Sequence, residues 1–142
     1  MAKSRYIVVV GCGRLGSLLA NQLSRSGHSV VIIDTHAAAF RQLSAEFSGF
    51  RITGDATEMG VLREAQIQRA DCLLAVTDRD NLNLMVAQTA KVMFEVPMVI
   101  ARVYDPGRED IYREFGIATI SPTQLSAQAL LDLLFHDNSI VL

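Results

Sequence analysis

The chain has 142 residues, half of them hydrophobic, with 13 basic and 15 acidic side chains and a formal net charge of −2 at pH 7. This length and apolar fraction suit one domain whose core needs neither disulfides nor a structural metal. The near-neutral charge gives no electrostatic footprint for nucleic acid, and few aromatic side chains are available to stack bases.

The N-terminal residues lead directly into the first predicted strand, which leaves no room for a signal peptide. No later apolar run approaches the roughly 18 residues that a membrane span needs. We therefore expect a cytoplasmic protein that does not insert into the membrane.

The first predicted strand, Tyr6–Val10, is followed at once by the glycine-rich sequence GCGRLG at positions 11–16. Gly11 is expected to permit the tight turn, Gly13 to let the backbone approach a pyrophosphate, and Gly16 to let helix and strand pack closely. Unpaired N–H groups at the start of the helix then favour an anion. A glycine turn alone is weak evidence, so its context decides its meaning.

A helix is predicted from Leu15 to about Ser26, and a second apolar strand, Ser29–Ile33, ends at Asp34. Asp34 lies 18 positions after Gly16, close to the spacing of about 20 at which an acidic residue accepts hydrogen bonds from a ribose. A carboxylate there also repels a 2′-phosphate, which disfavours NADP. The alternative is that Asp34 only caps the following helix.

The glycine loop also carries side chains with two interpretations. Arg14 suits bidentate contact with a phosphate chain, or it is a solvated surface arginine. Cys12 lies at a helix N-terminus, which would lower its pKa and make it redox-sensitive, or it is a small packing residue. Cys72 is expected in the core, and the two cysteines form no metal-binding pattern.

Strands and helices continue to alternate after Asp34, as is typical of a parallel sheet covered on both faces. Helices are predicted over about 36–47, from about 58 to 65, over about 80–95, from 105 to 115 and over about 122–135. Strands are predicted over 50–53, 72–76, 98–103 and 117–120. Six strands with helical crossovers predict an α/β, Rossmann-type doubly wound sheet in one domain, with order 3-2-1-4-5-6 and a ligand crevice beside the first strand.

Helical periodicity predicts buried faces for the internal helices. The residues expected on them are Phe40, Leu43 and Phe47; then Met59, Leu62 and Ala65; and then Leu82, Met85, Val86, Ala90 and Met93. Asp78 or Asp80 is the expected N-cap of the helix over 80–95, and Gly116 the expected stop after residue 115. The last helix has an apolar stripe of Leu125, Leu130, Leu133 and Leu134.

Residues at the carboxyl ends of the strands are candidates for binding. They are Gly11, Cys12, Gly13, Arg14, Leu15, Gly16, Asp34, Thr35, Gly54, Asp55, Ala56, Thr57, Thr77, Asp78, Asn81 and Arg102. Asp55 is expected either to accept from an adenine amino group or to cap a helix. Thr77 and Asn81 either line the second half of the crevice or serve in capping and turn formation. Arg102 lies in an apolar strand, where a buried arginine needs a carboxylate or a ligand phosphate.

We expect no enzyme, no catalytic residue and no metal site. The six-strand unit leaves no substrate domain, and neither His28, His36 nor His136 is placed to act as a general acid. The GxSxG, HExxH and Walker A patterns are absent.

Together, the glycine loop, Asp34, the GDAT sequence at 54–57, the TDRDN sequence at 77–81 and Ala101-Arg102 resemble a known family. It is the N-terminal nucleotide-binding domain of potassium-transport regulators, called TrkA-N, KTN or RCK. The resemblance runs from Arg5 to about Leu134. Many such regulators continue into a second ligand-binding lobe, and whether this chain is a stand-alone lobe or part of a longer protein is left open.

The resemblance implies a cytosolic domain that binds NAD(H) or an adenine nucleotide (ATP, ADP or AMP) and gates a membrane potassium channel or transporter. It implies that the glycine loop with Arg14 holds phosphates, that Asp34 holds the ribose and that 55–57 lie near the adenine. Arg102 would lie in or near the same cleft.

Two other interpretations stay open: a small NAD-dependent oxidoreductase, or the cofactor-binding half of one, and a structural assembly module with a vestigial loop. The leucine-rich helix over about 122–135 and the apolar tail at 140–142 favour a homo-oligomer. The alternative is that these residues close over their own sheet.

Overall fold

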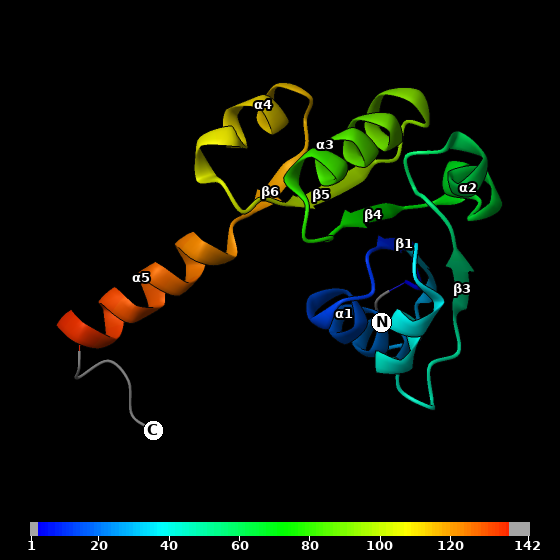
Figure 1. The fold of residues 1–142 in the computed structure, drawn as a ribbon, viewed down its shortest axis with the longest axis horizontal. Coiled ribbons are helices and arrows are strands. Elements are labelled where there is room, and N and C mark those ends of the chain that lie inside the picture. Colours follow the sequence, from blue (N-terminus) through cyan, green and yellow to red (C-terminus); the bar gives the residue numbers. More distant parts are fainter. Residues whose placement is uncertain (1–2, 137–142) are drawn as a thin grey trace.

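The computed structural model describes residues 3–136, and its centre is one sheet of parallel strands with helices on both faces (Figure 1). The strands are β1 (Tyr6–Val10), β2 (Ser29–Asp34), β3 (Phe50–Thr53), β4 (Cys72–Ala75), β5 (Met98–Arg102) and β6 (Ala118–Ile120). Their positions match the predicted ones to within a residue at each end.

The strand order is β3-β2-β1-β4-β5-β6, as predicted. β1 lies between β2 and β4, so that Val8 is opposite both Val31 and Leu73. From β1 the chain builds outward through β2 and β3, and then returns to add β4, β5 and β6 on the other side. The order therefore reverses between β1 and β4, which is where doubly wound sheets bind ligands.

Helices connect all the strands. They are α1 (Arg14–Arg25), the 3-10 helix η1 (Ala37–Gln42), α2 (Met59–Glu64), the 3-10 helix η2 (Ile67–Arg69), α3 (Asp80–Gln88) with its π-helical continuation η3 (Thr89–Met93), the 3-10 helix η4 (Pro106–Arg108), α4 (Glu109–Glu114) and α5 (Pro122–Phe135). Within residues 3–136, no helix has both the length and the hydropathy to cross a membrane.

The α-helix predicted over 36–47 is wrong. Only the short 3-10 helix η1 forms there, and Leu43 is already extended. The backbone N–H of Ser44 donates to the side chain of Asn21 on α1, at 2.9 Å, instead of continuing a helix. Leu43 and Phe47 are nevertheless buried, so the apolar pattern identified residues of the core in a segment that is not helical.

The helix predicted over about 80–95 is present, but two details differ. Its N-cap position is Arg79, without a side-chain bond, because the carboxylate of Asp80 accepts the backbone N–H groups of Tyr104 and Asp105 from the neighbouring loop. Met85 and Met93 were expected on the buried face and are 53% and 61% exposed. The buried face instead has i, i+3, i+4, i+7 spacing and consists of Asn83, Val86, Ala87 and Ala90.

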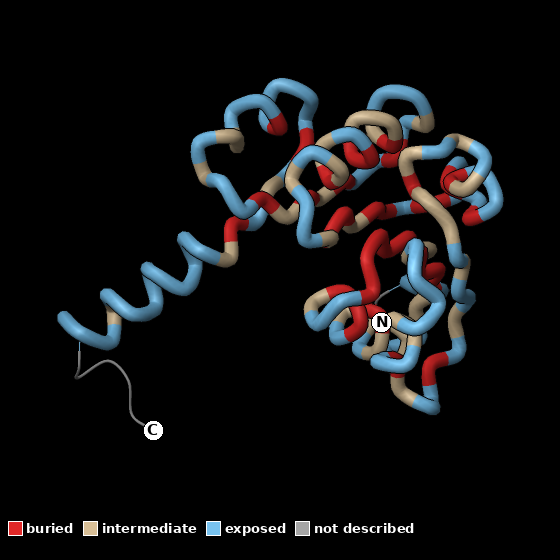
Figure 2. Tube along the Cα trace, in the orientation of Figure 1, coloured by how far each residue is buried: buried red, intermediate tan, exposed pale blue. Residues whose placement is uncertain are grey.

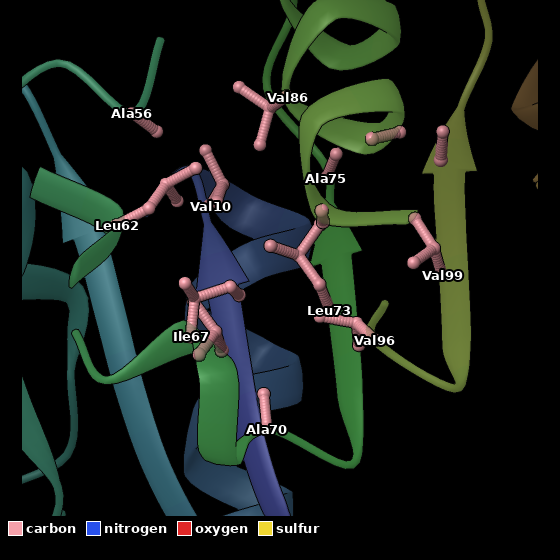
Figure 3. Packing of buried hydrophobic residues seen from close by; sticks show 14 of the residues in the cluster. Val10, Ala56, Leu62, Ile67, Ala70, Leu73, Ala75, Val86, Val96 and Val99 are labelled. Atoms are coloured by element: carbon pink, nitrogen blue, oxygen red, sulfur yellow. The ribbon is translucent and has the colours of Figure 1, made fainter. Parts of the chain in front are cut away.

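Two buried clusters form the core, one on each face of the sheet. Alternation along β1 divides its side chains: Val8 and Val10 belong to one cluster, and Ile7 and Val9 to the other. Figure 3 shows the first cluster, where side chains of β4 and β5 meet those of α2 and α3. Burial on both faces explains why the strands are continuous apolar runs.

Helix α5 extends away from the sheet (Figure 1), and Figure 2 shows it exposed along most of its length. Its predicted stripe is open to solvent: Leu125, Leu130, Leu133 and Leu134 are between 48% and 71% exposed. The alternative in which these leucines close over their own sheet is therefore wrong. The apolar tail at 140–142 lies outside the described residues.

Candidate functional site

A cleft of about 780 Å³ opens at the carboxyl edge of the sheet, where the strand order reverses. Thirteen of the sixteen predicted binding residues line it; Gly16, Thr57 and Asn81 do not. The predicted residues that line it are Gly11, Cys12, Gly13, Arg14, Leu15, Asp34, Thr35, Gly54, Asp55, Ala56, Thr77, Asp78 and Arg102.

The N-terminus of α1 presents unpaired amides beside the glycine loop. The first intrahelical bond runs from the N–H of Ser17 to the carbonyl of Gly13, at 2.9 Å, so the N–H groups of residues 14–16 have no acceptor within the helix. The first turn contains no acidic residue and no side-chain cap. A Cβ placed on Gly13 would meet nothing within 4 Å. This end of the helix is therefore electropositive and open to an anion.

The other two glycines serve the geometry of the turn. Gly11 has a φ of 106°, a conformation that favours glycine, and its N–H donates to the carbonyl of Ile33 at 2.8 Å. A Cβ on Gly16 would lie 1.8 Å from the carbonyl oxygen of Gly11. Gly16 therefore acts through the close packing of α1 on the β1 turn, as predicted, and does not face the cleft.

Asp34 ties the glycine loop to the end of β2. Its Oδ2 accepts the N–H of Cys12 at 2.8 Å and its Oδ1 accepts the N–H of His36 at 2.9 Å. His36, and not Asp34, is the N-cap residue of η1, so the capping alternative is not what the structure shows. A carboxylate oxygen has more than one lone pair, so these bonds leave acceptor capacity toward the cleft.

The redox interpretation of Cys12 is wrong. The residue is fully buried, and its thiol donates to the carbonyl of Ala39 at 3.4 Å. Burial, with the neighbouring Asp34 carboxylate, raises the pKa of Cys12 to about 11, opposite to the direction that a helix N-terminus alone would give. The thiol is therefore a packing group beneath the loop.

Asp55 stands at the end of β3 and is held by Thr57. Its Oδ1 accepts both the N–H of Thr57, at 2.9 Å, and the Thr57 hydroxyl, at 2.7 Å. These bonds hold the pKa of Asp55 below its ordinary value, with a smaller contribution from the charge of Arg79. The N-cap of α2 is Glu58, so Asp55 forms a turn before the helix and does not cap it. Thr57 orients Asp55 and does not line the cleft itself.

Asn83 is the residue of this region that sequence reasoning missed. It is fully buried on α3. Its Oδ1 accepts from the N–H and the hydroxyl of Thr77, at 3.0 and 2.6 Å, and its Nδ2 donates to the carbonyls of Thr77 and Arg102, at 3.1 and 2.9 Å. It therefore joins the ends of β4 and β5. An amide on the apolar face of a helix was the available signal, because a buried amide must find partners.

Of the remaining predicted residues, Asn81 lies outside the cleft and Arg102 lines it. Asn81 is exposed and accepts from Arg108, outside the cleft. Arg102 lines the cleft, but none of the ion pairs among residues 3–136 includes it, so the expected protein carboxylate is not there. Its guanidinium carbon lies 4.5 Å from the ring centroid of Tyr104. Further lining residues that were not predicted are Val10, Ile33, His36, Ala39, Gln42, Val76, Arg79, Leu82 and Tyr104.

Residues 7–122 match the TrkA-N domain family. The chain belongs to this family. It is 42% identical to the Trk system potassium uptake protein TrkA of Streptomyces coelicolor over 126 residues, which is 89% of this chain and 56% of that protein. It is 40% identical to a TrkA homolog of Pyrococcus abyssi over 77% of this chain and 48% of that protein. The TrkA-N chain thus spans about half the length of the curated relatives that it matches.

Solved structures share the fold. The TrkA-N domain of the inner membrane protein ybaL from Escherichia coli has a TM-score of 0.82 at 22% identity, covering 94% of this chain and 99% of that one. The Kef CTD of Shewanella denitrificans, in AMP-bound form, has a TM-score of 0.78 at 24% identity, with 92% and 82% covered. The GsuK channel bound to NAD has a TM-score of 0.70 at 19% identity, covering 84% of this chain and 22% of that one. GsuK bound to ADP has a TM-score of 0.73 at 18% identity, covering 87% of this chain and 32% of that one. The TrkA-N fold is therefore one that carries nucleotides in other proteins.

Among residues 3–136, no group of three or more His, Cys, Asp or Glu side chains is placed to hold a metal ion. The charged groups that line the cleft include the carboxylates of Asp34, Asp55 and Asp78 and the guanidinium groups of Arg14, Arg79 and Arg102. Guanidinium groups and backbone amides donate to phosphate oxygens, and carboxylates accept from hydroxyl groups.

Proposed function

We propose that this TrkA-N domain binds NAD(H) or an adenine nucleotide and regulates a membrane potassium channel or transporter, without being an enzyme. The observation that carries the proposal is the pairing of uncapped amides at the start of α1 with the carboxylates of Asp34 and Asp55 across one cleft. Amides and the helix dipole suit phosphates, and carboxylates suit ribose hydroxyls and the adenine amino group. NADP is disfavoured because Asp34 would face its 2′-phosphate.

The potassium part of the proposal rests on the relatives, which are named as Trk system potassium uptake proteins. In this function the domain acts on the cytoplasmic side of the membrane beside a transporter or channel subunit. A nucleotide shifts such a partner only if it binds two conformations of the regulator with different affinity. The regulatory signal would therefore be the identity of the bound nucleotide.

The nucleotide site is tested by thermal unfolding of the purified chain with NAD, NADH, ATP, ADP and AMP, for the wild type and for Asp34→Ala. A ligand at 100 times its Kd stabilises the folded state by about 2.7 kcal/mol, which corresponds to roughly 8 °C for a chain of this size. We expect a selective shift that Asp34→Ala abolishes and that Asp110→Ala, on the exposed face of α4, retains. No shift with any nucleotide, in protein freed of copurified ligand, contradicts the proposal.

We also propose that α5 joins two copies of the chain. Its exposed leucines would be shielded from water in a dimer or higher oligomer. Sedimentation of the wild type and of the Leu130→Gln, Leu134→Gln double variant tests this, with Gln128→Ala on the same helix as the control. The double variant should be monomeric at concentrations where the wild type and the control are associated. A monomeric wild type would refute the assembly.

The regulatory role is tested on the full-length protein by rubidium uptake in cells that produce it. The wild type and Asp34→Ala should give different uptake rates at equal protein levels. Equal rates, in a variant shown to have lost nucleotide binding, would separate nucleotide binding from transport.

A further inference from the structure

Charge is divided unevenly between the two halves of the cleft. The carboxylates of Asp34 and Asp55 lie at the ends of β2 and β3, on one side of β1. On the other side, beyond β4 and β5, the cleft is lined by Arg79 and Arg102, with Asp78 as the single acidic residue. Arg14, the first residue of α1, also lines the cleft. The half beside β4 and β5 therefore carries net positive charge.

Arg102 is fixed in place without an acceptor for its charge. Asn83 holds its backbone carbonyl at 2.9 Å, and its guanidinium lies over the ring of Tyr104. The Nε of Arg102 is buried and has no hydrogen-bond partner; it is the one such side-chain atom among residues 3–136. A buried donor of this kind needs an explanation, and an anionic ligand is the simplest one at a cleft wall.

Arg79 provides a second, independent cation. It is exposed and lines the same cleft, and its charge is felt by Asp55 across the opening, since it contributes to the lowered pKa of that carboxyl. Its backbone N–H donates to the hydroxyl of Thr77 at 3.2 Å, which ties the start of α3 to the end of β4. Two guanidinium groups from adjacent strand ends thus face one space.

We propose that Arg79 and Arg102 form a subsite for the terminal phosphates of a nucleoside polyphosphate, which makes ADP and ATP the preferred ligands of this domain. The proposal rests on the nucleotide-binding function proposed above. The nucleoside lies toward Asp34 and Asp55, the first phosphate lies on the amides of α1, and the later phosphates reach the two arginines. Guanidinium groups bind phosphate oxygens with bidentate geometry, so the subsite is selective for an anion.

The same arrangement discriminates against the other candidate ligands. In NAD(H) the second phosphate is esterified to a ribose, so it carries a single negative charge, and the remainder of the dinucleotide would bring that ribose and a nicotinamide ring to this half. That ring is cationic in NAD and uncharged in NADH, so neither supplies an anion to the arginines. AMP ends at its first phosphate. Charge complementarity therefore ranks ADP and ATP above AMP and NAD(H).

The test is isothermal titration calorimetry of the full chain with ATP, ADP, AMP, NAD and NADH, with EDTA present so that the free nucleotide is the ligand. The variants are Arg102→Met, Arg79→Gln and, as a charge-matched control, Arg25→Gln at the exposed far end of α1. We expect ADP and ATP to bind the wild type at least tenfold more tightly than AMP or NAD. Arg102→Met should lower the affinity for ADP and ATP tenfold or more and change that for AMP less than threefold.

Arg79→Gln, on an exposed loop, should weaken ADP and ATP selectively and keeps the test decisive if Arg102→Met does not fold. Arg25→Gln should bind like the wild type. The subsite is refuted, while the proposed function stands, if NAD binds more tightly than ADP, or if the variants weaken AMP and ADP equally. If no nucleotide binds the wild type, the proposed function fails and the subsite with it.

Discussion

Replacement of Asn83 by alanine tests how the cleft is held open. The side chain of Asn83 makes four hydrogen bonds, three to Thr77 and one to the carbonyl of Arg102, and it is excluded from solvent. Alanine removes all four bonds. It leaves the N–H of Thr77 and two backbone carbonyls without these partners at the ends of β4 and β5.

The expected loss in free energy of unfolding follows from the number of hydrogen bonds that the substitution removes. Each contributes about 1 kcal/mol net, and a buried group left unsatisfied costs somewhat more. Alanine regains roughly 0.5 kcal/mol because it is the better helix former. We therefore expect Asn83→Ala to lower the free energy of unfolding by about 3 to 4 kcal/mol, which lowers the midpoint of thermal unfolding by roughly 10 °C.

Urea unfolding followed by circular dichroism measures this loss, and Asn81→Ala is the matched control. Asn81 lies on the same helix two residues earlier, is exposed and bonds only to Arg108 among the described residues, so its variant should lose less than about 0.5 kcal/mol. The reasoning is refuted if Asn83→Ala loses less than about 1 kcal/mol with an unchanged m-value, or if both variants lose the same amount.

Three further predictions concern the loop and the strand ends. Gly16→Ala places a Cβ 1.8 Å from a backbone oxygen and should lower the free energy of unfolding by about 2 kcal/mol or more. Gly60→Ala, with open space around it, should be neutral or stabilising in urea unfolding. Equal effects of the two substitutions would refute the packing argument. Cys12 and Cys72 have raised pKa values and are buried, so both should resist a thiol reagent at pH 8 until urea unfolds the chain, and rapid labelling of the folded protein would contradict this. The pKa of Asp55 is depressed in the folded state, so the stability that its carboxylate contributes is present above its unfolded-state pKa and is lost as pH falls through its folded-state pKa. The difference in free energy of unfolding between the wild type and Asp55→Ala should be constant above about pH 5 and shrink below about pH 4. A difference that grows toward low pH would contradict this argument.

The fold could be predicted because its local signals agree with its topology. β1 is an apolar run that ends in a glycine turn, and the same alternation of strand and helix continues to β6. Where the helix over 36–47 was wrongly predicted, a contact from a distant part of the chain accounts for the difference. The segment after Gln42 has no local reason to leave a helix, but the side chain of Asn21 accepts the N–H of Ser44. The apolar periodicity of the sequence does not predict that hydrogen bond.

The site was predictable to the extent that it lies at strand ends. Asp34 is the last residue of β2, and Asp55 and Thr77 each lie two residues beyond the end of a strand. A parallel sheet brings such positions to one edge. Residues such as Tyr104 and Gln42 reach the cleft through loop and 3-10 geometry that no pattern specifies. Asn83 was missed for a different reason, since polar residues on helices are ordinarily read as exposed.

Hydrogen bonds within the protein hold the shape of the glycine loop. The N–H of Gly11 is bonded to β2, the N–H of Cys12 to Asp34, and the carbonyl of Cys12 to the side chain of Gln42 at 2.9 Å. A loop fixed in this way loses little conformational freedom when a ligand binds, so more of the contact energy appears as affinity. Asp34 therefore has two separable roles, as an expected ribose acceptor and as a support of the loop. Loss of binding in Asp34→Ala measures their sum, whereas Arg102 and Arg79 lie outside this network and report on the phosphate contacts alone.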